Sequence, residues 1–299
     1  MDVLRTPDSR FENLPDYAFK PNYLDDLKGY EGLRAHYLDE GPVKAQRTFL
    51  CLPGEPTWAY LYRRMVPVFA DAGARVLVPD WLGFGRSDKP VDDDVYSFDF
   101  HREMMLAFIK KLDLQNITLV VQDWGGILGL TLPMDLRDRF SRLIVMNTAL
   151  PVGESLGEGF QGWKDYVASR PDLDCSALMK RACPHLTEAE ALAYEAPFPD
   201  QRYKAGVRRF PQLVMIEPGM DGIETAKRAR KFWHTEWQGE SFMAIGAQDP
   251  VLGVPVMSKL REIIRGCPGP MILEEAGHFV QEWGDQVART ALKHFGDMP

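Results

Sequence analysis

Residues 117–129 read Ile-Thr-Leu-Val-Val-Gln-Asp-Trp-Gly-Gly-Ile-Leu-Gly. Their first five residues are almost entirely apolar, which is typical of a strand buried on both faces. Asp123 then interrupts the run, Gly125 and Gly126 follow, and the next apolar residues have helical spacing. The stretch therefore predicts a buried strand that turns sharply into a helix, with a carboxylate at the turn.

The chain on either side of this turn alternates between apolar runs and amphipathic segments. This alternation predicts βαβ units and a mainly parallel, doubly wound α/β sheet. Residues 1–30 are rich in Pro, Asp, Asn and Tyr and are expected to be mostly coil. The expected strands are 33–39, 48–52, 74–80, 143–147, 242–246 and 271–274, and the expected helices are 57–72, 97–112, 223–236, 255–265 and a last one ending near 295.

The pattern changes between residues 151 and 218. Pro and Gly are frequent there, strand-like runs disappear, and the segments are short and amphipathic. We interpret this part as a helical cap domain (151–218) inserted into a core domain made of residues 1–150 and 219–299.

Composition narrows the class of protein. The 299 residues are 45% hydrophobic and carry a net charge of −8, which argues against non-specific binding to nucleic acid or to an anionic membrane surface. No run of 18 apolar residues predicts a membrane span, and the first residues show no signal peptide. The four cysteines have no metal-site spacing. We expect a cytoplasmic monomer without metal or organic cofactor.

Asp123, Asp249 and His278 each follow an expected strand, and they occur in the order nucleophile, acid, histidine. Because sites in doubly wound sheets form at the carboxyl ends of strands, these side chains are expected to meet. The turn at Asp123 resembles the nucleophile elbow of α/β-hydrolases, with Asp in place of Ser and Val121 in place of the first Gly. The alternative is that Asp123 only caps the following helix.

A carboxylate at this position predicts displacement at saturated carbon. It is ionised near neutral pH, attacks without a base, and would leave an ester that water must hydrolyse. His278 suits the role of general base, and Asp249 would hold its tautomer. The fold implied by the elbow places two N–H donors beside the ester, from Glu55 and Trp124. The Glu55 side chain could also hold the water or be an ordinary surface acid, and Glu55–Pro56 is a candidate cis peptide.

Four segments carry a resemblance to a known family. Residues 50–58 (Leu-Cys-Leu-Pro-Gly-Glu-Pro-Thr-Trp), 80–90 (Asp-Trp-Leu-Gly-Phe-Gly-Arg-Ser-Asp-Lys-Pro), 120–126 and 276–282 (Ala-Gly-His-Phe-Val-Gln-Glu) resemble haloalkane dehalogenases, and most closely the dichloroethane-degrading subgroup. The resemblance covers the core better than the cap. One departure is Pro53, where the family usually has His, and it puts the support of the Glu55 loop in question.

The resemblance implies a small haloalkane substrate, water as the second reactant, a halide product and a role in detoxification. It also implies a halide site, made of indole N–H donors from Trp124 and from a cap residue, for which Trp163 is the leading candidate. The pocket walls implied by family position are Phe160, Ile127, Phe198, Pro199, Val251 and Leu252.

Other readings stay open at this point. An epoxide hydrolase would use the same Asp-His-Asp set with cap tyrosines, and Tyr166, Tyr194 and Tyr203 are available. A fluoroacetate-type dehalogenase would need cations near the pocket, and the elbow has none. A non-catalytic receptor on the same fold would usually lack part of the triad.

Overall fold

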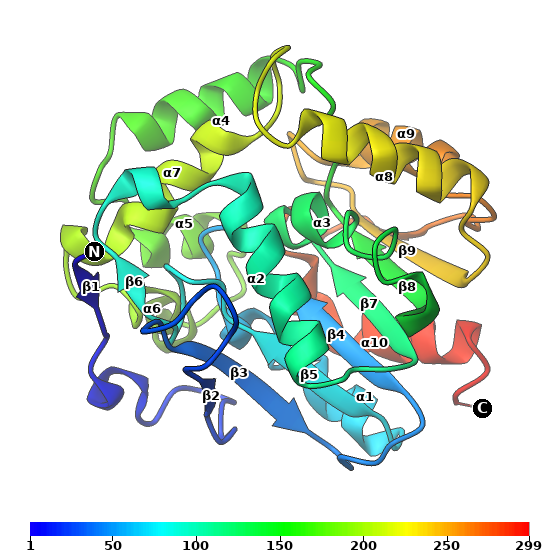
Figure 1. Cartoon of the computed structure of the whole chain (residues 1–299), viewed down its shortest axis with the longest axis horizontal. Helices are drawn as coiled ribbons and strands as arrows, with labels where there is room; N and C mark the ends of the chain where they lie inside the picture. Colours follow the sequence, from blue (N-terminus) through cyan, green and yellow to red (C-terminus); the bar gives the residue numbers. More distant parts are fainter. Residues whose placement is uncertain (299) are drawn as a thin grey trace.

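The computed structural model describes residues 1–298 and has an eight-stranded sheet at its centre (Figure 1). The strand order is β10-β9-β8-β7-β4-β5-β3-β2, and all neighbours are parallel except β3, which is antiparallel to both β5 and β2. The strands are β2 (Asn22–Leu24), β3 (Ala35–Glu40), β4 (Thr48–Leu52), β5 (Arg75–Pro79), β7 (Ile117–Val121), β8 (Phe140–Met146), β9 (Glu240–Gly246) and β10 (Met271–Leu273). The predicted α/β architecture is confirmed.

Two apolar layers cover the sheet. On one face lie α2 (Phe98–Lys111), α3 (Trp124–Gly129), α8 (Ile223–Thr235) and α9 (Val254–Ile263), and on the other lie α1 (Val66–Asp71) and α10 (Gly284–His294). Within β7, Leu119 and Val121 pack into the first layer and Val120 into the second. All three are fully buried, as expected for a strand covered on both faces.

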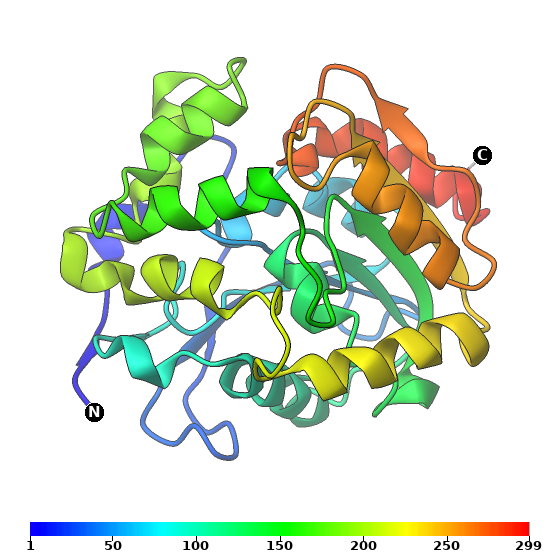
Figure 2. The same cartoon turned by 90° about the horizontal axis from the view of Figure 1, so that it is seen from above.

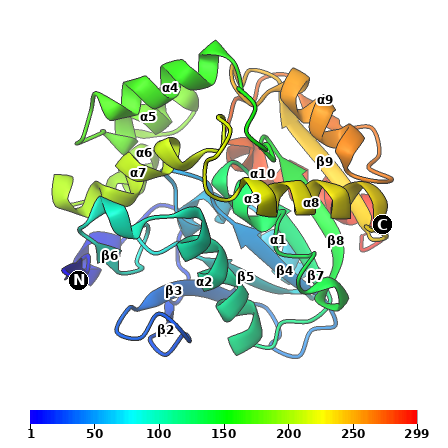
Figure 3. The same ribbon diagram turned by 45° about the horizontal axis from the view of Figure 1, so that its top comes forward.

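The segment between β8 and α8 contains four α-helices: α4 (Glu158–Ala168), α5 (Cys175–Ala182), α6 (Glu188–Glu195) and α7 (Ala205–Leu213). Figures 2 and 3 show them gathered on one side of the sheet, next to the turn between β7 and α3. These helices therefore cover the edge of the sheet where the predicted catalytic side chains emerge.

Local sequence signals account for several boundaries and fail at others. Helix α2 begins after Ser97, whose hydroxyl accepts a hydrogen bond from the Phe100 N–H at 3.1 Å, as predicted. The predicted helix over 57–72 is wrong, because the chain forms a 3₁₀ turn (Ala59–Tyr62) and then the short helix α1. Pro67 explains the break, since it has no N–H to continue a helix from the preceding turn.

The N-terminal residues are more regular than predicted. Strand β1 (Val3–Leu4) pairs with β6 (Lys89–Pro90), and β2 forms the edge of the main sheet. Strands β1 and β2 have only two and three residues, which is too short for an alternating pattern to predict them. No helix within residues 1–298 is long and apolar enough to cross a membrane.

Candidate active site

Asp123 stands at a strained turn. Its backbone has φ +50° and ψ −126°, a conformation that a residue with a side chain rarely adopts. The turn is tight because Gly125 lies against β4, where a Cβ would come within 1.9 Å of the Leu52 carbonyl oxygen. The Asp123 side chain forms no capping hydrogen bond with α3, so the helix-cap alternative is wrong. The carboxylate is presented to the cavity instead.

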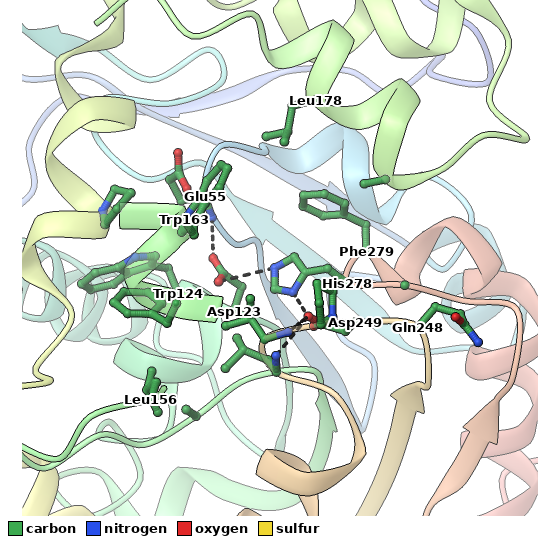
Figure 4. Close-up of a pocket in the computed structure, with 18 of the residues that line it drawn as sticks. Glu55, Asp123, Trp124, Leu156, Trp163, Leu178, Gln248, Asp249, His278 and Phe279 are labelled. Carbon is green, nitrogen blue, oxygen red and sulfur yellow. Dashed lines mark hydrogen bonds and ion pairs between the residues drawn. The ribbon is translucent and has the colours of Figure 1, made fainter. Parts of the chain in front are cut away.

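His278 links the two aspartates. Its Nδ1 lies 2.7 Å from Oδ2 of Asp249, and its Nε2 lies 3.5 Å from Oδ2 of Asp123 (Figure 4). The Asp249 carboxylate also accepts hydrogen bonds from the N–H groups of Val251 and Leu252 at 2.9 and 3.0 Å and from the Asn147 amide at 3.0 Å. These three donors favour the ionised form of Asp249. The carboxylate can then accept a hydrogen bond from the His278 Nδ1–H.

In this triad, the interactions between charges outweigh the effect of burial on the pKa values of His278 and Asp249. Burial alone would lower the pKa of His278, but Asp249 and Asp123 outweigh it and raise the pKa to about 10. Burial would likewise raise the pKa of Asp249, but the His278 charge and the hydrogen bonds hold it well below its usual range. The imidazolium is thus stabilised for as long as both carboxylates are charged.

The Glu55 loop holds the second oxygen of the nucleophile. The Glu55 N–H donates to Oδ1 of Asp123 at 2.8 Å, and the Glu55–Pro56 peptide is cis, as predicted. Pro53 does not loosen this loop, because its carbonyl accepts the Trp81 indole N–H at 2.7 Å. Gly54 lies so close that a Cβ there would come within 2.4 Å of the Asp123 Cβ.

The Glu55 side chain points into the same region and is 5% exposed. Its Oε1 has no hydrogen-bond partner within residues 1–298. Burial and the neighbouring Asp123 carboxylate raise the pKa of Glu55 well above its ordinary value. It is therefore not a surface acid, and its free oxygen is available to a molecule in the cavity.

A cavity of about 520 Å³ opens over the Asp123 carboxylate. Most of its wall is apolar, and Figure 4 shows Trp124 and Trp163 on the side of Asp123 opposite His278. The indole N–H groups of Trp58, Trp81, Trp233 and Trp237 all donate to protein acceptors. Within the described residues, no such bond involves the N–H of Trp124 or Trp163, so both lining tryptophans keep a free donor.

Comparison with known proteins agrees with this geometry. The family model for the alpha/beta hydrolase fold matches residues 47–285. A haloalkane dehalogenase of Psychrobacter cryohalolentis is 44% identical and covers 100% of both chains, and one of Mycolicibacterium paratuberculosis is 40% identical and covers 98% of both. The structure of haloalkane dehalogenase DpaA from Paraglaciecola agarilytica superposes with a TM-score of 0.96 at 53% identity, over 98% of each chain.

The chain belongs to the haloalkane dehalogenases. These are hydrolases that act on carbon–halide bonds, so the predicted family and class of enzyme are confirmed. The DpaA structure is described as tetrameric, so the comparisons do not support the expected monomer.

The predicted pocket walls of this dehalogenase separate into two groups. Phe160, Ile127, Val251 and Leu252 line the cavity. Phe198 and Pro199 were predicted wrongly: the cavity wall does not include them. Phe198 packs edge-on against Phe84 in the core, and Pro199 is exposed.

The cap tyrosines do not form an epoxide hydrolase site. The cavity wall, as the described residues form it, includes none of Tyr166, Tyr194 or Tyr203. Tyr194 is fully buried and donates to Glu282, while Tyr166 stacks on Trp163 and lies under Arg170. An opening epoxide oxygen in the cavity would therefore find no acidic hydroxyl from these residues.

Sequence reasoning missed several residues of this site. Asn147 and Gln122 directly follow β8 and β7, and both contact the triad. The available signal is a polar residue at the carboxyl end of a buried strand, and it holds for these neutral amides as well as for charged side chains. Arg181 of α5 and Glu275 after β10 also line the cavity and are exposed, which their sequence context does not indicate.

Proposed function

We propose that this dehalogenase hydrolyses small haloalkanes through a covalent ester on Asp123. The observation that carries the proposal is the environment of that carboxylate. One oxygen accepts the Glu55 N–H at 2.8 Å, and the other faces both the cavity and His278. The held oxygen fixes the carboxylate, so Oδ2 is the attacking atom.

In the first step, Oδ2 of Asp123 forms a bond to the substrate carbon while the carbon–halogen bond breaks on the opposite side. The halogen leaves with the bonding electrons as halide. Trp124 and Trp163 receive it, because their free N–H groups strengthen their bonds as negative charge develops. The mostly apolar wall of the cavity makes these bonds stronger than they would be in solution.

In the second step, a water attacks the ester carbonyl of Asp123 and gives its proton to Nε2 of His278. Alkylation has by then removed the negative charge of Asp123, so one of the two causes of the high pKa of His278 is gone. Asp249 holds the proton on Nδ1 and stabilises the imidazolium. The N–H groups of Glu55 and Trp124 hold the developing oxyanion.

Collapse of this intermediate breaks the bond between the Asp123 carbonyl carbon and the ester oxygen. The alkoxide takes the proton from His278 and leaves as an alcohol. Asp123 returns to a carboxylate and releases one proton, so the balance is haloalkane and water to alcohol, halide and a proton. Glu55, with its buried free oxygen, is suited to positioning the attacking water.

Four further expectations belong to the same proposal. Residues 151–218 act as a cap domain over the core of 1–150 and 219–299, so pocket size depends on how the helices α4–α7 sit. The monomeric state, the cytoplasmic location and a role in detoxification stay predictions. Sedimentation velocity tests the monomeric state, with a tetramer like that of DpaA as the contrary result.

The test is bromide release from 1,2-dibromoethane and 1-bromobutane by the intact protein and by Asp123→Asn. We expect bromide from the intact protein only. Hydrolysis of styrene oxide is measured in parallel, because diol formation without bromide release would replace this proposal with an epoxide hydrolase.

A further inference from the structure

Gln122 connects the nucleophile turn to the histidine. It directly precedes Asp123, is fully buried, and its Nε2 lies 2.8 Å from Nε2 of His278 and 3.1 Å from the His278 carbonyl oxygen. Its Oε1 accepts from the Gln281 amide at 3.4 Å. The side chain thus touches the nitrogen that must act as the base, without reaching the substrate cavity wall.

The direction of this contact is fixed by chemistry. A carbonyl oxygen can only accept a hydrogen bond, so the Gln122 atom beside the His278 carbonyl is the amide nitrogen, which can only donate. The same nitrogen lies 2.8 Å from Nε2 of His278, so this contact is a hydrogen bond only when that nitrogen is unprotonated. The ring proton then lies on Nδ1, where Asp249 receives it.

We propose that Gln122 is a positioning residue that favours the neutral imidazole of His278, with Nε2 unprotonated as general-base catalysis requires, once alkylation has removed the charge of Asp123. The inference rests on the proposed roles of His278 and Asp123. A donor at Nε2 stabilises the neutral ring and is repelled by the N–H of an imidazolium. Its two bonds, to the ring and to the backbone of the same residue, also fix the rotation of the ring.

General-base catalysis needs a neutral His278, but the carboxylates around it favour the charged ring. The groups that face His278 are the carboxylates of Asp249 and Asp123, with Glu55 further along the cavity. Glu275 and Arg181 lie on the cavity wall and are exposed to solvent. The near carboxylates favour the charged ring, whereas Gln122 favours the neutral one.

The test separates the two chemical steps with single turnovers of 1-bromobutane over a range of pH. Bromide release reports alkylation, and butanol formation reports hydrolysis by His278. Gln122→Met removes the donor, and Gln122→Glu replaces it with an acceptor of the same shape. Gln248→Glu is the control for the added charge, because Gln248 lies on the cavity wall and its amide contacts the Glu274 carbonyl and not His278.

We expect both Gln122 variants to keep the bromide burst. In Gln122→Met, the acid limb of the pH–rate profile for butanol formation should move up by about one pH unit, because one hydrogen bond to the neutral form of His278 is lost. In Gln122→Glu the limb should move up by more. Butanol formation below that limb should fall roughly ten-fold.

Three results would overturn the inference. One is an acid limb of Gln122→Met at the wild-type pH, and another is an equal shift in Gln248→Glu. The third is loss of the bromide burst in Gln122→Met, which would mean that Gln122 maintains the Asp123 turn and not the base. Absence of a burst in the wild-type protein would instead refute the proposed function itself.

Discussion

Replacing Asp249 with Asn should stop the reaction half-way. The N–H groups of Val251 and Leu252 fix Oδ1 of Asp249 as an acceptor, so the new amide nitrogen must take the place of Oδ2. That atom lies 2.7 Å from Nδ1 of His278 and 3.0 Å from the amide nitrogen of Asn147. Two donors would then meet at each contact. The ring proton is therefore expected to move from Nδ1 to Nε2, where Oδ2 of Asp123 at 3.5 Å is the acceptor.

A proton on Nε2 removes the base. Loss of the correct tautomer in a histidine–aspartate pair lowers turnover by about 10⁴-fold, which corresponds to about 5 kcal/mol of activation free energy. Alkylation does not use this base. Asp249→Asn should therefore release one equivalent of bromide from 1-bromobutane and accumulate an enzyme carrying one butyl group.

The assay is rapid-quench bromide analysis with intact-protein mass spectrometry. Asn147→Ala is the matched control, because it removes a neighbouring donor to Asp249 and leaves the carboxylate in place. It should turn over more slowly than the wild type but still form butanol in the steady state, because His278 keeps its carboxylate acceptor. Butanol formation by Asp249→Asn within ten-fold of the wild-type rate would refute the reasoning, as would the absence of a butylated species.

Three further predictions concern the halide site, the Glu55 loop and pH. Trp163→Phe should slow bromide release by roughly 10²–10³-fold in single turnovers, because one donor to the leaving halide is lost, whereas Trp283→Phe, outside the cavity wall, should not. Gly54→Ala should abolish the bromide burst, because its Cβ would come within 2.4 Å of the nucleophile, while Gly162→Ala, with nothing within 4 Å, should keep it; an active Gly54→Ala would contradict the geometry. The raised pKa of His278 means that the folded state binds its proton more tightly than the unfolded chain, so this stabilisation is complete below about pH 6.5 and is lost as pH rises through about 10. Urea unfolding should show that decline in the wild type and a flatter profile in His278→Gln, and identical profiles would be inconsistent with it.

The core of the fold was predictable because its signals are local. The apolar run 117–121, the glycines after Asp123 and the strand ends at Asp249 and His278 each obey rules that hold wherever a doubly wound sheet forms. The triad geometry then follows from topology, since the carboxyl ends of parallel strands share one edge.

The cap was less predictable because its contacts depend on tertiary packing. Trp163 and Phe160 do line the cavity, but Phe198, assigned by family position, turns into the core against Phe84. Nothing in the sequence around Phe198 reports that choice, because an apolar side chain suits either environment. Gln122 is not predictable for another reason: the role of a neutral amide depends on the atoms that it contacts, and the sequence does not show these.

The source of the oxygen atom in the alcohol tests the covalent mechanism most directly. In a single turnover of the wild-type enzyme in water labelled with oxygen-18, the ester mechanism transfers an oxygen of Asp123 to the alcohol. It predicts unlabelled butanol from 1-bromobutane and a labelled Asp123 carboxylate in the active-site peptide. Labelled butanol with an unlabelled Asp123 would show that water displaces the halide directly, and would contradict the assignment of Asp123 as the nucleophile.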